Sequence, residues 1–150
     1  MALDAYAYIY SNSNQTLSVG EAITFNMIGK LNNIAFTPSS SVITINDGGD
    51  YLIKYIVSTN AQLNANQTFD SRFTIRISGS DQTPESVYFN ETTNFSSNTN
   101  SIIEQVSGQM ISNISDGSTI QLISSSGGNI TASPAFGSGV SASIIIMKLS

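Results

Sequence analysis

Alternating apolar and polar positions run along much of the chain and predict β-strands, because successive side chains of a strand point to opposite faces. The clearest one-sided example is Arg72–Ser78, in which Phe73, Ile75 and Ile77 alternate with polar residues. We expect those three side chains to face a core and the polar ones to face water, as in an antiparallel sheet with one solvated side.

Three other runs are apolar on both faces. The central one lies in Val42–Thr59, where an Asn-Asp-Gly-Gly-Asp turn separates two apolar runs. Its second run places Tyr51, Ile53, Tyr55 and Val57 on one face and Leu52, Lys54, Ile56 and Ser58 on the other. The other two such runs are Ala5–Tyr10, with Tyr6, Tyr8 and Tyr10 on one face, and the closing Ser141–Leu149.

The remaining elements are predicted to be short strands separated by polar turns. Further strands are expected at Glu21–Ile28, Ile34–Phe36, Val42–Ile45, Val87–Phe89, Ile102–Ile114 and Thr119–Ile123. Loops are expected at Ser11–Gln15, Asn60–Gln67, Gly79–Pro84, Asn90–Asn100, Ser124–Gly128 and Pro134–Gly139. No long segment has a helical period, so the pattern predicts one all-β domain over residues 1–150, a two-sheet antiparallel jelly-roll sandwich.

The two-faced strands predict self-association. In a two-layer sandwich each sheet has one face on the internal core, so a sheet built from such strands would leave an apolar, tyrosine-rich outer face. Monomers rarely expose patches of this kind, and a closed symmetric oligomer would cover it. The alternative is a single central sheet whose second side is covered by loops of the same chain.

Composition excludes most chemistry. The chain has no Cys and no His, so it lacks a thiolate nucleophile, the usual general base and the commonest metal ligand. Charged residues make up only 10% of the sequence, against roughly 25% in an ordinary soluble domain. The formal charge of -5, with five basic residues and no basic patch, argues against nucleic-acid binding. We therefore expect no enzyme, no catalytic residue and no cofactor.

Membrane insertion is not expected either. The start of the chain, Met1–Asp4, lacks the basic region and apolar run of a signal peptide or anchor. No apolar run approaches the roughly 20 residues that span a bilayer.

Several residues suggest sites but have simpler interpretations. Asp47 and Asp50 flank a Gly-Gly turn and could bind calcium, yet Asp beside Gly is ordinary turn chemistry, so no metal site is predicted. Tyr88 and Phe89, beside Asn90 and Glu91, could stack on a sugar or belong to a short strand with one core-facing aromatic.

Other polar groups suggest neither hydrolysis nor glycosylation. The pairs Asp81 with Glu85 and Glu91 with Glu104 show no sign of facing each other across a cleft, and Lys54 and Lys148 have no serine motif beside them. Six Asn-x-Ser/Thr triplets are close to the number expected by chance in so Asn-, Ser- and Thr-rich a chain. They begin at Asn14, Asn66, Asn90, Asn94, Asn113 and Asn129.

Two motifs resemble the superfamily of tumour necrosis factor and the complement globular heads. Gly49–Tyr55, with Ile45 before it, resembles the Gly-x-Tyr strand of that superfamily. Ile114–Leu122 resembles its Leu-x-x-Gly-Asp-x-Val-x-Leu turn and strand, with Asp116 and Gly117 in reversed order. The resemblance implies a ten-strand jelly roll that trimerises.

The last strand resembles a narrower group. Ser141–Leu149 is similar to the final strand of the C-terminal domain of the BclA-like Bacillus collagen-like exosporium glycoproteins, and the Phe25-Asn26 segment also resembles that domain. No Gly-X-Y repeat precedes the domain in this sequence, so either a collagen-like stalk was left out or the chain is a stalkless relative.

The resemblance also implies which strands form the inner sheet: Tyr6–Tyr10, Tyr51–Val57, Ile102–Met110 and Ile144–Leu149. This assignment agrees with the count of apolar faces made from the pattern alone, which selects Ala5–Tyr10, Tyr51–Val57 and the closing strand. We therefore predict a homotrimer packed around a threefold axis. Its predicted interface residues are Tyr6, Tyr8, Tyr10, Tyr51, Ile53, Tyr55, Ile145 and Met147.

Two functions remain open. The first is a structural trimerisation and display head of a collagen-like filament on the extracellular surface of a spore, the exosporium, with other spore-surface proteins as further partners. The second is a trimeric recognition head, either lectin-like or a phage fibre tip, that binds a receptor or host glycan through its loops. A stalk encoded upstream would favour the first, and glycan binding lost on Tyr88→Ala would favour the second.

Overall fold

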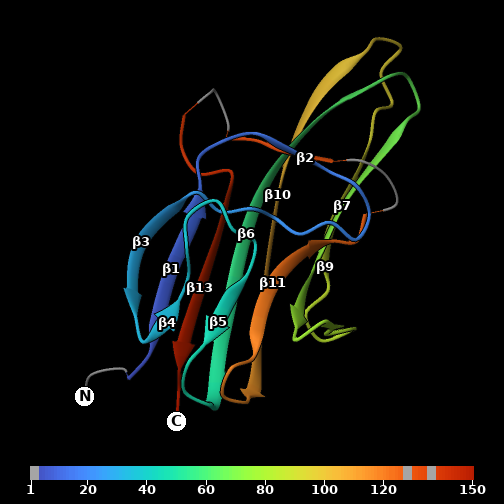
Figure 1. Cartoon of the computed structure of the whole chain (residues 1–150). Coiled ribbons are helices and arrows are strands. Elements are labelled where there is room, and N and C mark those ends of the chain that lie inside the picture. Colours follow the sequence, from blue (N-terminus) through green and yellow to red (C-terminus); the bar gives the residue numbers. More distant parts are fainter. Residues whose placement is uncertain (1–3, 127–129, 135–137) are drawn as a thin grey trace.

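Two antiparallel sheets pack face to face in the computed structural model, which describes residues 4–126, 130–134 and 138–150 (Figure 1). The described residues form strands and connecting turns, and they contain no helix that could cross a bilayer. The all-β prediction is therefore confirmed.

One sheet has seven strands and the other has six. The seven-stranded sheet contains β1 (Tyr6–Ser11), β2 (Gln15–Leu17), β3 (Met27–Asn32), β6 (Gly49–Leu63), β10 (Asn100–Ile114), β12 (Ile130–Ala132) and β13 (Ala142–Lys148). The six-stranded sheet contains β4 (Ile34–Ala35), β5 (Ile43–Ile45), β7 (Thr68–Ile77), β8 (Ser80–Asp81), β9 (Tyr88–Thr93) and β11 (Thr119–Ser124).

Strand β6 is the axis of the seven-stranded sheet. One of its edges pairs with β10 along all 15 residues, and the other pairs with β13 and then β12. Strand β1 lies on the far side of β13, and β3 lies beyond β1. The four strands predicted to share a sheet therefore do so, as β1, β6, β10 and β13.

The core lies between the sheets and consists mainly of isoleucines and aromatic rings. The seven-stranded sheet supplies Ala7, Ile9, Tyr51, Ile53, Tyr55, Ile144 and Ile146, and the six-stranded sheet supplies Ile43, Ile45, Phe73, Ile75, Ile120 and Leu122. The Tyr55 hydroxyl lies 3.1 Å from the Phe73 carbonyl and 2.9 Å from that of Ser86. Burial raises the pKa of Tyr55, so the phenol stays protonated and can donate.

Several predicted boundaries are wrong. In the predicted strand Glu21–Ile28, Ala22 and Phe25 form isolated bridges and only Met27 and Ile28 belong to a strand. That strand is β3, four residues of which lie beyond the predicted end. Gly29 is an extra residue at a bulge in β3, opposite Tyr8 and Ile9. Because the bulge breaks the alternation of side chains, the sequence pattern does not predict this strand. Strands β2 and β12 are not predicted by the sequence pattern. Strand β10 is regular, and its pairing with β6 is unbroken along its length.

Strands β6, β7 and β9 extend beyond their predicted ends. Strand β6 continues to Leu63, and β9 continues to Thr93, so part of each predicted polar loop is strand. Thr74, predicted to face water, is buried on the outer side of β7, because the Gln82–Val87 segment covers it and the Ser86 hydroxyl lies 2.9 Å from its own. The predicted loops Ser124–Gly128 and Pro134–Gly139 lie partly outside the described residues.

Two loops at one end of the sandwich, 63–68 between β6 and β7 and 94–100 between β9 and β10, are here called the tip (Figure 1). Asn94, almost fully buried, joins these loops. Its side-chain amide donates to the carbonyls of Leu63, Asn64 and Asn98, and its Oδ1 accepts from the Ser96 backbone N–H and the Asn100 amide. A buried asparagine therefore holds the tip together.

Glu104 is an unexpected core residue. It faces inward from β10 and is only 4% exposed, and neither carboxylate oxygen has a hydrogen-bond partner among the described residues. Its register partner on β6 is Thr59, whose hydroxyl is paired with that of Ser71 at 2.7 Å. The part of the core around Thr59, Ser71 and Glu104 is thus polar, and the Glu104 carboxylate lies in it without a hydrogen-bond partner among the described residues.

We expect Glu104→Met to stabilise the domain. An unsatisfied buried polar group costs about 1–3 kcal/mol, and methionine keeps the length of the side chain while removing that group. Thermal and denaturant unfolding should show a gain of this size. The control is Glu91→Met at an exposed glutamate on β9, where we expect a change within about 0.5 kcal/mol. A loss of stability in Glu104→Met would show that the carboxylate is satisfied.

Candidate functional site

The outer face of the seven-stranded sheet is the main candidate site, and we call it the tyrosine face. Its side chains come from β1, β13, β6 and β10 and all point away from the core. They are Tyr6, Tyr8, Tyr10, Ser143, Ile145, Met147, Leu52, Lys54, Ile56, Ser107, Gln109 and Ile111.

Register arranges these residues in rows across the sheet, because directly opposite residues of paired strands point to the same side. One row runs from Tyr8 through Ile145 and Lys54 to Gln109. The rows on either side are Tyr6, Met147, Leu52 and Ile111, and Tyr10, Ser143, Ile56 and Ser107. The face is thus a continuous apolar surface interrupted by a few small or polar positions.

Register also corrects three predicted interface residues. Tyr51, Ile53 and Tyr55 point into the core of the same chain and are at most 1% exposed, so their side chains are already packed by their own chain. The two-faced pattern identified both faces of β6 but not which face is inner. The Tyr8–Ile145–Lys54 row decides this, since it places Lys54 on the outer side.

The other predicted interface residues do lie on the tyrosine face. Tyr6, Tyr8, Tyr10 and Met147 are half-buried there, and Ile145 is 37% exposed. Their role in association remains a prediction. Sequence reasoning omitted Leu52, Ile56 and Ile111 from the interface, although Leu52 and Ile56 had been placed on the second face of β6.

Two hollows mark the tyrosine face. The smaller, about 270 Å³, is lined by Tyr6, Ala7, Tyr8, Lys30, Ile145 and Met147. The larger, about 500 Å³, lies where Ser107, Gly108 and Ser143 provide little side-chain bulk. It is also lined by Lys54, Tyr55, Ile56, Tyr88, Gln109 and Ile145. Both hollows could accept apolar side chains of a partner.

The tyrosine rings are held in place by packing within the sheet. Tyr8 stacks on Tyr10 with ring centroids 5.3 Å apart, and a methyl group added to Gly29 would overlap the Tyr8 ring. Gly29 is the extra residue of the β3 bulge, so its backbone approaches the ring closely. The bulge and the ring are therefore adapted to each other.

Lys54 lies on the tyrosine face, and Lys30 lines its smaller hollow. In the described chain neither forms a salt bridge; the ion pairs there join Arg72 with Asp70, Arg76 with Asp81 and Lys148 with Asp47. Lys54 stands between Ile145 and Gln109 in the central row and keeps its ammonium group exposed. The face can bind by packing and hydrogen bonding.

The possible calcium ligands are engaged otherwise. Asp47 is paired with the Lys148 ammonium, and this hydrogen bond raises the pKa of Lys148. Asp50 accepts from the amide of Asn113 at 2.9 Å. The described residues contain no group of three or more carboxylates, histidines or cysteines that could hold a metal.

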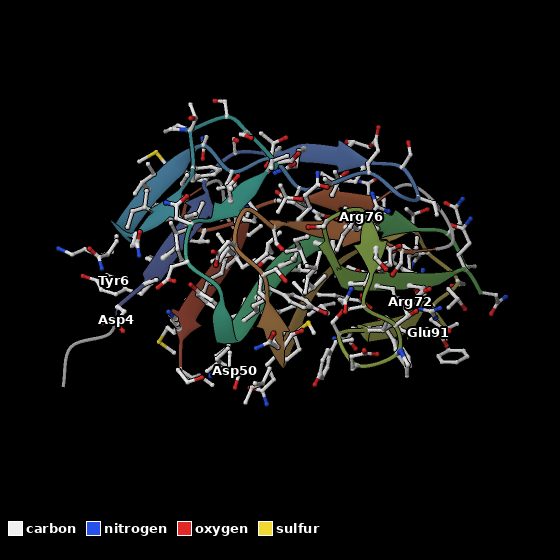
Figure 2. All side chains as sticks on the ribbon, turned by 60° about the horizontal axis from the view of Figure 1, so that its bottom comes forward. Asp4, Tyr6, Asp50, Arg72, Arg76 and Glu91 are labelled. Atoms are coloured by element: carbon white, nitrogen blue, oxygen red, sulfur yellow. The ribbon has the colours of Figure 1, made fainter. Side chains whose placement is uncertain are left out.

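The suggested carboxylate pairs do not form hydrolytic sites. Glu91 is exposed on the outer side of β9, whereas Glu104 lies between the sheets. Asp81 is bound to the Arg76 guanidinium, with 2.6 Å from Oδ1 to Nε. Figure 2 shows Arg72, Arg76 and Glu91 on the β7–β9 side, away from Tyr6 on β1.

Tyr88 and Phe89 point to different sides of the six-stranded sheet, so they do not form one sugar-stacking site. Tyr88 packs edge-on against Tyr55, with ring centroids 6.3 Å apart. Phe89 lies on the outer face, where the Arg72 guanidinium is 5.1 Å from its ring centre. The burial of Asn94 also shows that its Asn-x-Ser triplet is inaccessible to glycosylation in the folded chain.

Comparison with protein-family models and with curated proteins found no match. Solved structures do match over nearly the whole chain. The globular domain of zebrafish complement 1qA protein has a TM-score of 0.56 and 13% identity, covering 97% of this chain and 98% of that one.

Eiger TNF from S. frugiperda has a TM-score of 0.68 and 10% identity, covering 99% of this chain and 94% of that one. Together these similarities define the class: the chain has the two-sheet jelly-roll fold of tumour necrosis factor and the complement globular heads. The predicted fold is confirmed, and identities this low establish the fold alone.

We expect Gly29→Ala to disturb the tyrosine face specifically. The added methyl group must displace the Tyr8 ring, and forcing extra volume against a packed side chain costs about 1–3 kcal/mol. Near-ultraviolet circular dichroism should lose tyrosine signal while the far-ultraviolet β spectrum is retained. Gly79→Ala is the control, because nothing lies within 4 Å of an added Cβ there, although its positive φ carries a backbone cost of its own. Equal loss of tyrosine signal in both variants would contradict the proposed fit.

Proposed function

We propose that this chain is the self-associating head of a surface filament and that it forms a homotrimer through the tyrosine face. The observation that carries the proposal is this continuous apolar face on the outside of a sheet whose inner face already covers the core. Soluble monomers rarely expose such surfaces, and aromatic residues are enriched in protein interfaces.

A threefold arrangement is supported by the fold. Globular heads of this class commonly form homotrimers. The tyrosine face carries bulk and hollow at different places, since Tyr6, Tyr8 and Tyr10 lie on the β1 side and the larger hollow lies toward β10. A head-to-tail contact, in which tyrosines of one copy enter the hollow of the next, builds a ring when the rotation between copies closes, as it does in a trimer.

The ends of the chain suit a display role. Strand β1 begins and β13 ends at the same end of the sandwich, and the tip lies at the opposite end (Figure 1). A stalk joined at that shared end would hold the tip outward. Display on a collagen-like filament of a bacterial spore surface is our proposed setting, supported by the likeness of the closing Ser141–Leu149 segment to the exosporium glycoproteins.

We expect Ile145→Arg to convert the assembly into monomers. Ile145 borders both hollows, so a guanidinium there would have to be buried without a partner in any packed assembly. The free chain should still fold because the side chain points outward. Sedimentation velocity should show the mass of one chain, 15.9 kDa, with association weakened at least about a hundredfold.

Val42→Arg is the matched control. Val42 precedes β5 of the other sheet and is 37% exposed, the same fraction as Ile145. The assembly should keep its mass in this variant. If Ile145→Arg also leaves an assembly intact, the contact lies elsewhere on the molecule and the tyrosine face is not the interface.

A further inference from the structure

The tip is the most exposed ordered feature of the chain that self-association does not explain. Phe95, at the start of its second loop, is 85% exposed, more than the other exposed large hydrophobic residues described. The backbone beside it is nevertheless fixed. The Asn66 N–H donates to the Asn94 carbonyl, the Asn94 N–H donates to that of Gln67, and the Asn94 side chain is buried beneath.

Asparagines of both tip loops are tied to the backbone around Phe95. The Asn94 amide donates to the Asn98 carbonyl, and the Asn66 N–H donates to the Asn94 carbonyl, so the backbones of Asn98 and Asn66 lie close to the residue that precedes Phe95. The side-chain amides of Asn66 and Asn98 have no hydrogen-bond partner among the described residues. Both residues are exposed, so the tip presents free amide donors and acceptors on the same two loops as an exposed aromatic ring.

The tip carries no charge. Residues 63–68 and 94–100 contain no Asp, Glu, Lys or Arg, and most of them are Asn, Gln, Ser or Thr. A ligand with phosphate, sulfate or carboxylate groups would find no ion-pair partner in these loops. A neutral ligand with hydroxyl groups and an apolar face matches both the amides and the ring.

We propose that the tip is a binding site for a neutral carbohydrate. The Phe95 ring stacks on the apolar C–H face of a sugar ring, and the free amides of Asn66 and Asn98 hydrogen-bond its hydroxyl groups. Asn94 acts as a positioning residue that holds the two loops before the ligand arrives, which lowers the ordering cost of binding.

The location suits this role. The tip lies at the far end of the sandwich from the strand ends that carry the termini, so a stalk at those ends would leave it unobstructed (Figure 1). In this respect the inference rests on the proposed display function. The site itself is complete within one copy, because both loops belong to the same chain.

The other exposed aromatic cluster provides a matched control. Phe89 is 61% exposed, but it lies under the Arg72 guanidinium and beside Asp70 and Glu91 on the outer face of the six-stranded sheet. A charged glycan would suit that cluster better than the tip. Phe89→Ala and Phe95→Ala therefore remove comparable rings from sites of opposite character.

The test uses the full chain on an array of unsubstituted hexose and N-acetylhexosamine oligosaccharides, together with sialylated and sulfated members. We expect saturable retention on neutral members. Titration calorimetry with the best of these should show binding at least about tenfold weaker in Phe95→Ala and in Asn98→Ala. Phe95→Tyr should retain binding, and Phe89→Ala should leave it unchanged.

Three results would overturn the inference: no retention on any neutral member, binding that survives Phe95→Ala, or binding to charged members that is lost in Phe89→Ala. Unfolding curves of each variant separate loss of binding from loss of fold. The Ile145→Arg variant separates the two proposals, since a monomer should keep binding per copy and lose only the avidity of the assembly.

Discussion

The pairing register of β6 with β13 and β10 is the constraint on which the rest of this structure depends. Strand β6 is apolar on both faces, so hydrophobicity alone permits either face to be inner. A slip of one residue would exchange Tyr51, Ile53 and Tyr55 with Leu52, Lys54 and Ile56. The observed register buries the first set and places Lys54 outside, where its ammonium group can reach water.

This choice of inner face divides the tyrosines by role. Tyr55 is a core residue whose hydroxyl donates to the backbone carbonyls of Phe73 and Ser86. Gly108, its register partner on β10, has no side chain and so leaves space for the Tyr55 ring. The tyrosines of β1 remain outside, where the bulge at Gly29 accommodates one of them. Both faces of the seven-stranded sheet thus carry apolar side chains, but within a single chain only the inner face is covered by the other sheet.

Period-two patterning predicted the all-β fold class and the alternation along β6 and β1, because these depend on local sequence, and it marked β1, β6 and β13 as two-faced strands, whereas the family resemblance added β10 to their sheet. It could not predict which face of β6 is inner, since that depends on registry with strands about 50 and 90 residues away in sequence. The Gly29 bulge concealed β3 for a related reason. Asn94 looked like any other loop asparagine, because its partners Leu63 and Asn64 lie on a different loop. The exposed Phe95 beside it was missed with it.

In the proposed trimer, other copies of the chain cover the tyrosine face. The most direct test is the mass of the unmodified protein in solution by multi-angle light scattering over a range of concentrations. The account predicts a stable species of three times 15.9 kDa. A species of 15.9 kDa that persists at high concentration would contradict it, because the apolar face would then be stable in contact with water.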